Sequence, residues 1–432
     1  MLSRRVLLAY AAPALPMAAL YFPVYVFLAP FYAGTFGLSV TVIGAVLIAI
    51  RLMDAVTDPL MGWLSDRTRW RFGRRKTWMA LATPVIMVAV IGLLAPPDGV
   101  GLGWFTAFLV ALTLGWTMFL TPYFAWGAEM SGNYGERGKI TVWRESVGLI
   151  GTIIAAVIYG VLGERLGLSV IAAAVAIGLP VAAAIALRGV PETRALTTAT
   201  PQLSGILSAL RDEPIFRRLL IAYFINGAAN ALPATLFLFF VDHRLGATSE
   251  TGGLLLIVYF GAAVLAAPFW SWVAGRFQKH KAWCVAMVYA AAVFLCALTL
   301  GEGDVLLFTV IAGLSGLALG ADLSLPTAMQ ADVVDLDTQR SGQHRTGAFF
   351  AVWSVATKAS VALTGGLALI ILGAFGFDAN AQNSEMTLWV LALLYAGAPV
   401  VLKLWAIALM WGFPLDRARQ EEIRRGLEAG PA

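Results

Sequence analysis

Arg51-Leu-Met-Asp54-Ala-Val-Thr57-Asp58-Pro59 lies inside a long apolar stretch and places an arginine and two aspartates there. Asp54 and Asp58 are four residues apart, so a helix brings both carboxylates to one face, with Cβ atoms about 5–6 Å apart. Pro59 has no amide hydrogen, so the carbonyl oxygen of Ala55 loses its helical partner. Hard cations prefer such oxygen clusters. We therefore expect Asp54 and Asp58 to bind a hard cation.

The composition around this stretch is that of a membrane protein. The 432 residues are 59% hydrophobic and 13% charged, whereas soluble domains contain about 25% charged residues. Apolar stretches of about 20 residues recur along the chain, each long enough to cross a hydrocarbon layer of about 30 Å. Ionisable side chains at that depth cost about 2.5–3.5 kcal/mol each and usually mark ion or substrate pathways. The sequence predicts an all-α membrane protein.

The apolar pattern predicts about twelve transmembrane helices. They cover residues 6–32, 40–64, 76–96, 102–130, 141–163, 168–188, 217–241, 251–275, 282–300, 304–331, 346–374 and 386–412. The polar stretch 189–216 separates the first six from the last six. We expect an N-terminal six-helix bundle at 1–188, a cytoplasmic linker at 189–216, and a second six-helix bundle with a short cytoplasmic tail at 217–432.

The loop charges predict the orientation. Loops 66–76 and 276–281 are rich in Lys and Arg. Arg244 is the only Lys or Arg residue in loops 33–39, 97–103, 242–250 and 376–385. The positive-inside rule places the basic loops in the cytoplasm, and an even number of helices then places both termini there. The net charge of +5 is explained by these loops, so no nucleic-acid partner is expected. We expect a multi-pass protein of the plasma (inner) membrane.

The two halves carry the same residue types at nearly constant offsets. These pairs are Pro59/Pro268, Trp63/Trp272 and Arg67/Arg276 at 209 residues, Lys76/Lys281 at 205, Pro122/Pro326 at 204 and Glu129/Asp332 at 203. Parallel repeats of six helices are typical of the major facilitator fold.

Several motifs resemble those of the glycoside–pentoside–hexuronide:cation symporters, the melibiose-carrier-like branch of the major facilitator superfamily. These motifs are Asp54-Ala-Val-Thr-Asp-Pro-Leu-Met-Gly62, Gly73-Arg-Arg-Lys-Thr-Trp78, Pro122-Tyr-Phe-Ala-Trp-Gly-Ala-Glu129, and Ala331-Asp-Val-Val-Asp335 followed by Lys358. The resemblance implies a secondary active symporter with alternating access. It couples a small organic solute, a sugar or glycoside, to Na+, Li+ or H+, and needs no other cofactor.

The resemblance also implies roles for individual residues. Thr57 and Thr117 join the two aspartates in the cation site, although Thr57 stands where sugar-transporting members often have Asn. We expect the substrate-binding or coupling residues to be Lys358, Arg51, Arg144, Asn226, Asn230, Tyr25, Trp116 and Trp353. We expect the gating residues to be Asp66, Arg67, Arg75 and Arg276.

Simpler structural roles stand beside these. Mid-helix threonines such as Thr57 and Thr117 commonly bond a carbonyl one turn earlier. Asn226 and Asn230 share a helix face, and such residues often form interhelical hydrogen bonds. The alternative for Lys358 is an ion pair with a helix-two aspartate. For Arg144 it is anchoring by Glu129 or Glu145.

The sequence departs from the sugar transporters of this family at two positions. Their acidic sugar ligands on helices one and four fall here at about Ala18 and Leu120, which are apolar. The Asp-Ala-Val-Thr-Asp-Pro form also resembles animal lysophospholipid symporters, so a lysolipid-like or other amphiphilic substrate is the alternative. A non-transporting scaffold or receptor is a third hypothesis.

The sequence contains no motif that is typical of an enzyme active site. The three histidines are isolated in loops, and no phosphate-binding Gly-rich loop with Lys-Ser/Thr is present. We expect a non-enzymatic monomer whose partners are a small-molecule substrate, a monovalent cation and the lipid bilayer.

Overall fold

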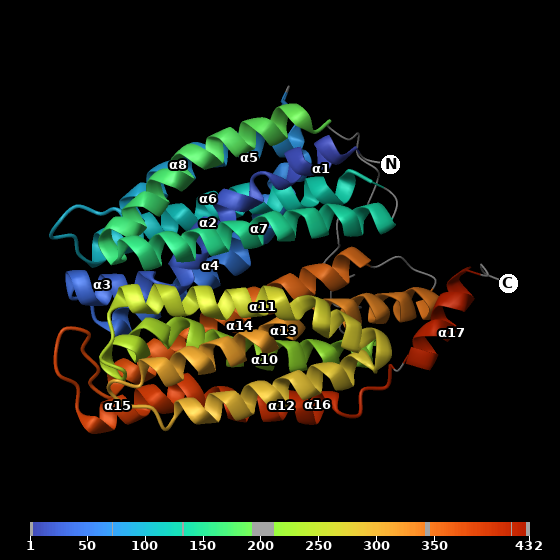
Figure 1. The fold of residues 1–432 in the computed structure, drawn as a ribbon. Coiled ribbons are helices and arrows are strands. Elements are labelled where there is room, and N and C mark those ends of the chain that lie inside the picture. The colour runs from blue at the N-terminus through green and yellow to red at the C-terminus, as the bar shows by residue number, and fades with distance from the viewer. Residues whose placement is uncertain are drawn as a thin grey trace. The chain divides into compact units, whose positions relative to one another are not determined.

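The computed structural model describes residues 3–70, 72–131, 134–191, 211–341, 346–415 and 417–428. The helices, labelled in Figure 1, are α1 (Arg4–Ala11), α2 (Ala14–Val26), α3 (Leu28–Phe36), α4 (Val40–Arg67), α5 (Arg74–Leu94), α6 (Leu102–Glu129), α7 (Tyr134–Leu162), α8 (Glu164–Gly189), α10 (Pro214–His243), α11 (Ser249–Arg276), α12 (Lys279–Ala297), α13 (Val305–Ser341), α14 (Thr346–Ala374), α15 (Glu385–Ala392), the π-helical η1 (Leu393–Gly397), α16 (Ala398–Met410) and α17 (Arg417–Glu428). Within the described ranges there is no strand.

Twelve helical segments in these ranges are long and apolar enough to cross a membrane. The predicted all-α fold class is confirmed. Ten of the twelve predicted spans are single α-helices, whereas the first is divided among α1, α2 and α3 and the last contains the η1 turn. Their ends differ from the prediction by a few residues in most cases. The larger differences are α13 and α7, which extend to Ser341 and start at Tyr134.

The first predicted span, 6–32, is broken into three pieces. The regular helix is interrupted at Ala12–Pro13, between α1 and α2, and again at Phe27, between α2 and α3. Prolines explain both interruptions. Pro13 has no amide hydrogen and interrupts the helical hydrogen-bond pattern, and Pro30 has no amide hydrogen to donate to the carbonyl oxygen of Val26. Pro59, in contrast, is accommodated within the continuous helix α4.

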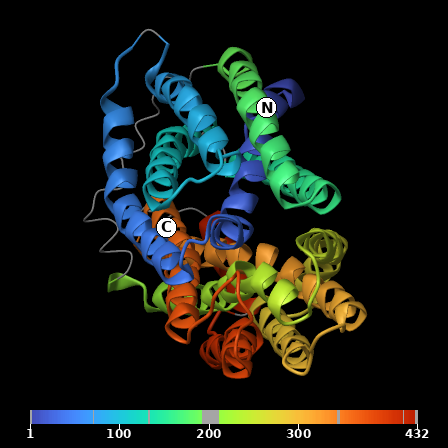
Figure 2. The same cartoon turned by 90° about the vertical axis from the view of Figure 1, so that its left-hand side faces the viewer.

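The chain divides into two compact units. Unit 1 is Met1–Thr198, Thr248–Leu254 and Leu369–Gln382, and unit 2 is Ala199–Ala247, Leu255–Ala368 and Asn383–Ala432. The expected linker 189–216 lies largely at residues 192–210, outside the described residues, so the predicted domain boundaries stay predictions. Figure 2 shows the helices of each unit after a turn of 90°, many of them viewed obliquely.

Unit 1 is held together by close helix contacts. α5 packs against α6 and α8, and α2 packs against α7 and α8. Tyr10 and Tyr123 each donate a hydrogen bond to the other's carbonyl oxygen, at 3.0 and 2.7 Å, which ties α1 to α6. At Gly151 of α7 an added Cβ would lie 2.1 Å from the carbonyl oxygen of Leu15, so only glycine permits this approach to α2.

Unit 2 has a comparable core. α10 packs against α16, and α12 packs against α13 and α16. Trp283 and Phe216 are fully buried among these helices. The C-terminal helix α17 packs on α13: Ile423 is buried, and the Gln420 amide bonds the Asp332 carboxylate.

Both units repeat the same contacts near one end of their helices. The Arg67 guanidinium lies 4.1 Å from the Trp63 ring centroid, and that of Arg276 lies 5.0 Å from the Trp272 ring centroid. The two pairs are the repeat-related residues of the sequence, so the offset of 209 residues reflects equivalent structure.

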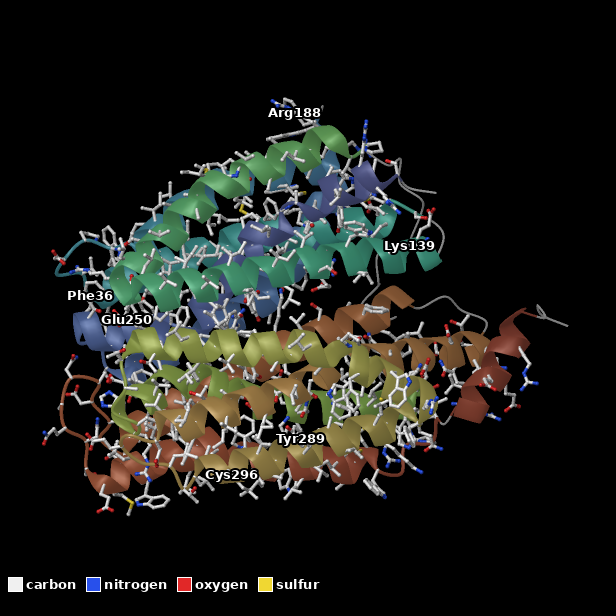
Figure 3. All side chains as sticks on the ribbon, viewed as in Figure 1. Phe36, Lys139, Arg188, Glu250, Tyr289 and Cys296 are labelled. Atoms are coloured by element: carbon white, nitrogen blue, oxygen red, sulfur yellow. The ribbon has the colours of Figure 1, made fainter. Side chains whose placement is uncertain are left out.

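In unit 1, basic residues lie at the end of the helices that the sequence predicts to be cytoplasmic. In Figure 3, Lys139 and Arg188 lie toward the end that carries the start of α1, and Phe36 lies at the opposite end. This distribution agrees with the positive-inside rule. The cytoplasmic side of the termini and the inner membrane stay predictions.

Candidate functional site

The predicted cation ligands come together in unit 1. Helix α4 carries Asp54 and Asp58 one turn apart, and α6 contributes Thr117. The Thr117 hydroxyl donates to Asp58 Oδ1 over 2.9 Å, and Arg51 Nη1 bonds Asp54 Oδ2 at 2.8 Å. Asp54 is 6% exposed, so its charge depends on local partners for stabilisation.

Thr57 adds a hydroxyl whose hydrogen-bonding capacity is unused. Its Oγ1 is buried and has no hydrogen-bond partner among the described residues. The usual bond to a carbonyl one turn earlier is therefore not made, unlike that of Thr83, whose hydroxyl bonds the Met79 carbonyl at 2.8 Å. A buried, unsatisfied oxygen costs free energy, and a cation bound beside Asp58 would satisfy it. Thr57 and Thr117 thus have the chemistry of cation ligands.

Aromatic rings lie next to this cluster. The Arg51 guanidinium lies 5.1 Å from the Tyr25 ring centroid, a cation–π distance. Tyr21 connects Tyr25 of α2 to Trp116 of α6, with ring centroids at 4.1 and 5.4 Å. Tyr21 is 41% exposed, so this aromatic wall has an accessible face. The sequence prediction included Tyr25 and Trp116 but missed Tyr21.

Arg144 of α7 has nearby partners within unit 1. Its Nη2 bonds Glu145 Oε1 at 2.6 Å, and its guanidinium lies 4.4 Å from the Phe124 ring centroid. Glu129, the other expected anchor, pairs with Arg74 and Arg75. The position of Arg144 agrees with the simpler anchoring role, and its role in coupling stays a prediction.

The predicted gating residues fall into two groups. Arg75 pairs with Asp66 at 2.5 Å and with Glu129 at 2.8 Å, which joins α4, α5 and α6. In unit 2 the repeat-related carboxylate Asp332 pairs with Lys279 at 2.7 Å. Arg67 and Arg276 instead stack on tryptophans of their own helices.

The candidate residues of α14 adjoin a second aromatic pair, in unit 2. Trp353 stacks on Tyr223, with ring centroids 3.9 Å apart and planes at 21°. The Tyr223 hydroxyl is 3.0 Å from Thr357 Oγ1. Lys358 follows Thr357 and is half-buried at the thirteenth residue of α14. Its coupling role stays a prediction.

Asn226 and Asn230 belong to a buried network. Their side-chain amides bond Asp322 at 3.0 and 2.9 Å, and Lys403 Nζ bonds their Oδ1 atoms at 2.9 Å each. Trp283 Nε1 also bonds Asp322, at 2.7 Å. The alternative of interhelical hydrogen bonding is therefore observed for both asparagines. The sequence prediction missed Asp322 and Lys403, although each is an ionisable residue within an apolar span.

Among described residues, no group of three or more His, Cys, Asp or Glu side chains forms a polyvalent metal site. The two aspartates with threonine hydroxyls offer instead a small set of oxygens with low net charge. Such a set suits a monovalent cation or a proton.

A family model described as MFS/sugar transport protein matches residues 9–417. The chain is 25% identical to sodium-dependent lysophosphatidylcholine symporter 1 of Gallus gallus, over 92% of this chain and 82% of the relative. It is 26% identical to the Homo sapiens symporter of that name, with 92% and 80% covered. It is 25% identical to a sphingosine-1-phosphate transporter of Mus musculus, with 91% and 86% covered.

Solved structures show the same fold. A bacterial homologue of the human lysosomal transporter Spinster, inward-facing and unoccupied, matches with TM-score 0.68 and 16% identity over 99% of this chain and 98% of its own. The nucleoside transporter NupG matches with TM-score 0.66 and 16% identity over 94% and 98%. The names of the relatives favour the lysolipid alternative over the sugar expected first.

Proposed function

Because the chain belongs to the MFS/sugar transport protein family of major facilitator transporters, we propose that it is a sodium-coupled symporter of a lysolipid-like amphiphile. The observation that carries the cation part is the Asp58–Thr117 bond of 2.9 Å, together with the buried hydroxyl of the preceding residue, Thr57, which has no hydrogen-bond partner among the described residues. In this proposal, α4 and α6 together supply the oxygens of the cation site. The relatives named as sodium-dependent symporters support the choice of sodium over lithium and protons.

Arg51 gives the site its coupling chemistry. With Arg51 paired to Asp54, the group formed by Arg51, Asp54 and Asp58 carries a net charge of −1 when both carboxylates are ionised. A sodium ion beside Asp58 brings this group to neutrality and competes with Arg51 for Asp54. The guanidinium released from Asp54 keeps its contact with Tyr25 and becomes available to an anionic group of the substrate. Cation and substrate then favour each other's binding, as symport requires.

Apolar and aromatic side chains of unit 1 support this substrate class. The positions at which the related sugar carriers have acidic residues hold Ala18 and Leu120, which cannot bind sugar hydroxyls. Tyr21, Tyr25 and Trp116 present aromatic surface instead. Such surface suits an alkyl chain or an amphiphile, and two sets of relatives are named for lysophosphatidylcholine and sphingosine-1-phosphate.

Uptake into proteoliposomes tests this proposal. The purified protein is reconstituted, and labelled lysophosphatidylcholine, sphingosine-1-phosphate and a glycoside are each offered with an inward sodium, lithium or proton gradient. We expect sodium-driven accumulation of a lysolipid and no accumulation of the glycoside. Accumulation of the glycoside alone would support the sugar carrier of the melibiose type, and no gradient-driven accumulation of any of the three would refute symport of these classes.

A further inference from the structure

Unit 2 contains a buried ion pair that the proposed function leaves unused. Lys403 of α16 is 1% exposed, and its Nζ lies 3.6 Å from Asp322 Oδ2 of α13, whose side chain is 11% exposed. A buried ion pair seldom stabilises a protein more than apolar side chains of similar volume would. Ionisable groups inside a membrane span are usually functional. The pair therefore calls for an explanation other than stability.

Three N–H donors stabilise the ionised carboxylate of Asp322. Its Oδ1 accepts hydrogen bonds from Asn226 Nδ2 at 3.0 Å and from Trp283 Nε1 at 2.7 Å. Its Oδ2 accepts a hydrogen bond from Asn230 Nδ2 at 2.9 Å. Hydrogen bonds to an ionised acceptor are stronger than those between neutral groups. A buried carboxylate still needs a positive charge nearby, and the Lys403 ammonium supplies it.

The Lys403 ammonium lies among oxygen atoms. Its Nζ donates hydrogen bonds to Asn226 Oδ1 and to Asn230 Oδ1, at 2.9 Å each. An ammonium only donates hydrogen bonds, and an ionised carboxylate only accepts them. The two asparagines can therefore contact both charges only with their oxygens toward Lys403 and their nitrogens toward Asp322, and this is the arrangement observed.

The oxygens around the ammonium come from other helices than the one that carries the lysine. Asn226 and Asn230 lie on α10 and Asp322 lies on α13, whereas Lys403 lies on α16. Two amide oxygens and one carboxylate oxygen thus surround a single positive charge. Carboxylate and amide oxygens are the ligands that hard cations prefer. The lysine contributes the cation and none of the ligands.

We propose that Asn226, Asn230 and Asp322 form a monovalent-cation site in unit 2 and that the Lys403 ammonium fills it as a tethered cation. The ammonium neutralises the buried carboxylate and connects α16 to α10 by hydrogen bonds, and no covalent bond is made or broken. Unit 2 therefore takes up no exchangeable cation at this position. In the proposed function, sodium then binds at Asp58 of unit 1, and the two units differ in the source of their cation.

Chemical rescue of Lys403→Ala tests this site without any knowledge of the substrate. The substitution removes the side chain from Cγ to Nζ, which are the atoms that n-propylammonium contains, and keeps every oxygen ligand. The melting temperature of the full-length variant is measured in propylammonium, ammonium, potassium and N-methylglucamine chlorides of equal concentration, and with propanol as the uncharged analogue.

We expect Lys403→Ala to melt below the wild type in N-methylglucamine. Propylammonium or a smaller cation should raise its melting temperature in a way that saturates with concentration, because the cation restores the charge beside Asp322. Propanol should not do so, and the wild type should show no such rise because Lys403 occupies the site. A folded Lys403→Ala that no small cation stabilises, or that propanol stabilises equally, would overturn the proposal.

Two control variants assign the effect to this site. Lys403→Ala/Asp322→Asn lacks the carboxylate, so we expect its melting temperature not to depend on which of these cations is present. Lys279→Ala removes a lysine of the same unit that pairs with Asp332 at 2.7 Å and whose side chain is 26% exposed. We expect no cation-specific recovery in that variant. Recovery of either control equal to that of Lys403→Ala would overturn the proposal.

A second pair of variants decides the matter if Lys403→Ala cannot be obtained folded. Lys403→Met fills most of the volume of the lysine but leaves the Asp322 charge uncompensated, whereas Lys403→Met/Asp322→Asn removes both charges. We expect the double variant to have the higher melting temperature and the larger folded fraction. Equal stability of the two would overturn the proposal. Absence of sodium-driven uptake by the wild type would refute the proposed function but would not affect these stabilities.

Discussion

Replacing Asp58 by Asn removes one negative charge from the cation site and keeps the site's shape. The Asn carbonyl oxygen can still accept the hydrogen bond that Thr117 donates over 2.9 Å, so we expect the variant to fold. Two unit charges about 4 Å apart at an effective dielectric constant of about 20 attract by about 4 kcal/mol. Because 1.4 kcal/mol corresponds to a factor of ten, we expect sodium affinity to fall roughly a thousandfold.

Two measurements check this expectation. Thermal unfolding of the purified variant gives its sodium affinity, and uptake into proteoliposomes gives its coupling. Asp98→Asn serves as the matched control, because the Asp98 side chain is 87% exposed in a loop of unit 1. We expect that control to behave as the wild type. Sodium-driven accumulation by Asp58→Asn at the wild-type level would refute the assignment of the cation site.

Three other substitutions, two of them paired with a control variant, test individual contacts. Thr117→Val removes a hydroxyl bonded to a carboxylate, a bond of about 1.5–3 kcal/mol, so sodium affinity measured by thermal shift should fall about tenfold or more; an unchanged affinity contradicts a ligand role. Arg75→Met removes one of the two arginines that pair with the buried Glu129, together with the Asp66 contact, and should lower the free energy of unfolding by up to about 3–5 kcal/mol. Arg67→Met, which loses only an exposed cation–π contact, should cost about 0.5–1 kcal/mol; equal losses in denaturant titrations would contradict this ranking. Gly151→Ala forces a methyl group against a backbone carbonyl of α2 and should cost about 1–3 kcal/mol, whereas Gly103→Ala, with no other atom within 4 Å of the added Cβ, should have no measurable effect on the melting temperature.

The spans were predictable because a bilayer imposes a single strong requirement on them, about 20 apolar residues per crossing. The broken first span was less predictable. Pro59 and Pro30 are both prolines in apolar stretches. Helix α4 continues through Pro59, whereas the helix is interrupted near Pro30. Tertiary packing decides which of the two outcomes occurs, and the local sequence does not contain that information.

The candidate site was predictable only within one helix or through a family resemblance. The spacing of Asp54 and Asp58 places them on one face of α4, but the contact with Thr117 joins residues 59 positions apart. For Asn226 and Asn230 the shared face was evident, whereas their partner Lys403 lies 177 and 173 residues away. Helical periodicity gives the direction of a side chain within its own helix and does not identify the helix that it meets.

The π-helical turn η1, Leu393–Gly397, precedes the helix that carries Lys403. A π turn holds one residue more than an α turn, and each residue of an α-helix rotates the chain by about 100°. The extra residue therefore sets the angular phase of everything that follows in α16. Deleting one residue of η1 would restore an ordinary α-helix and turn the Lys403 side chain about 100° away from its asparagine partners. Deleting one residue of η1, more than one turn away from Lys403, would thus separate the Lys403 ammonium from Asn226, Asn230 and Asp322. None of these four residues would itself be replaced.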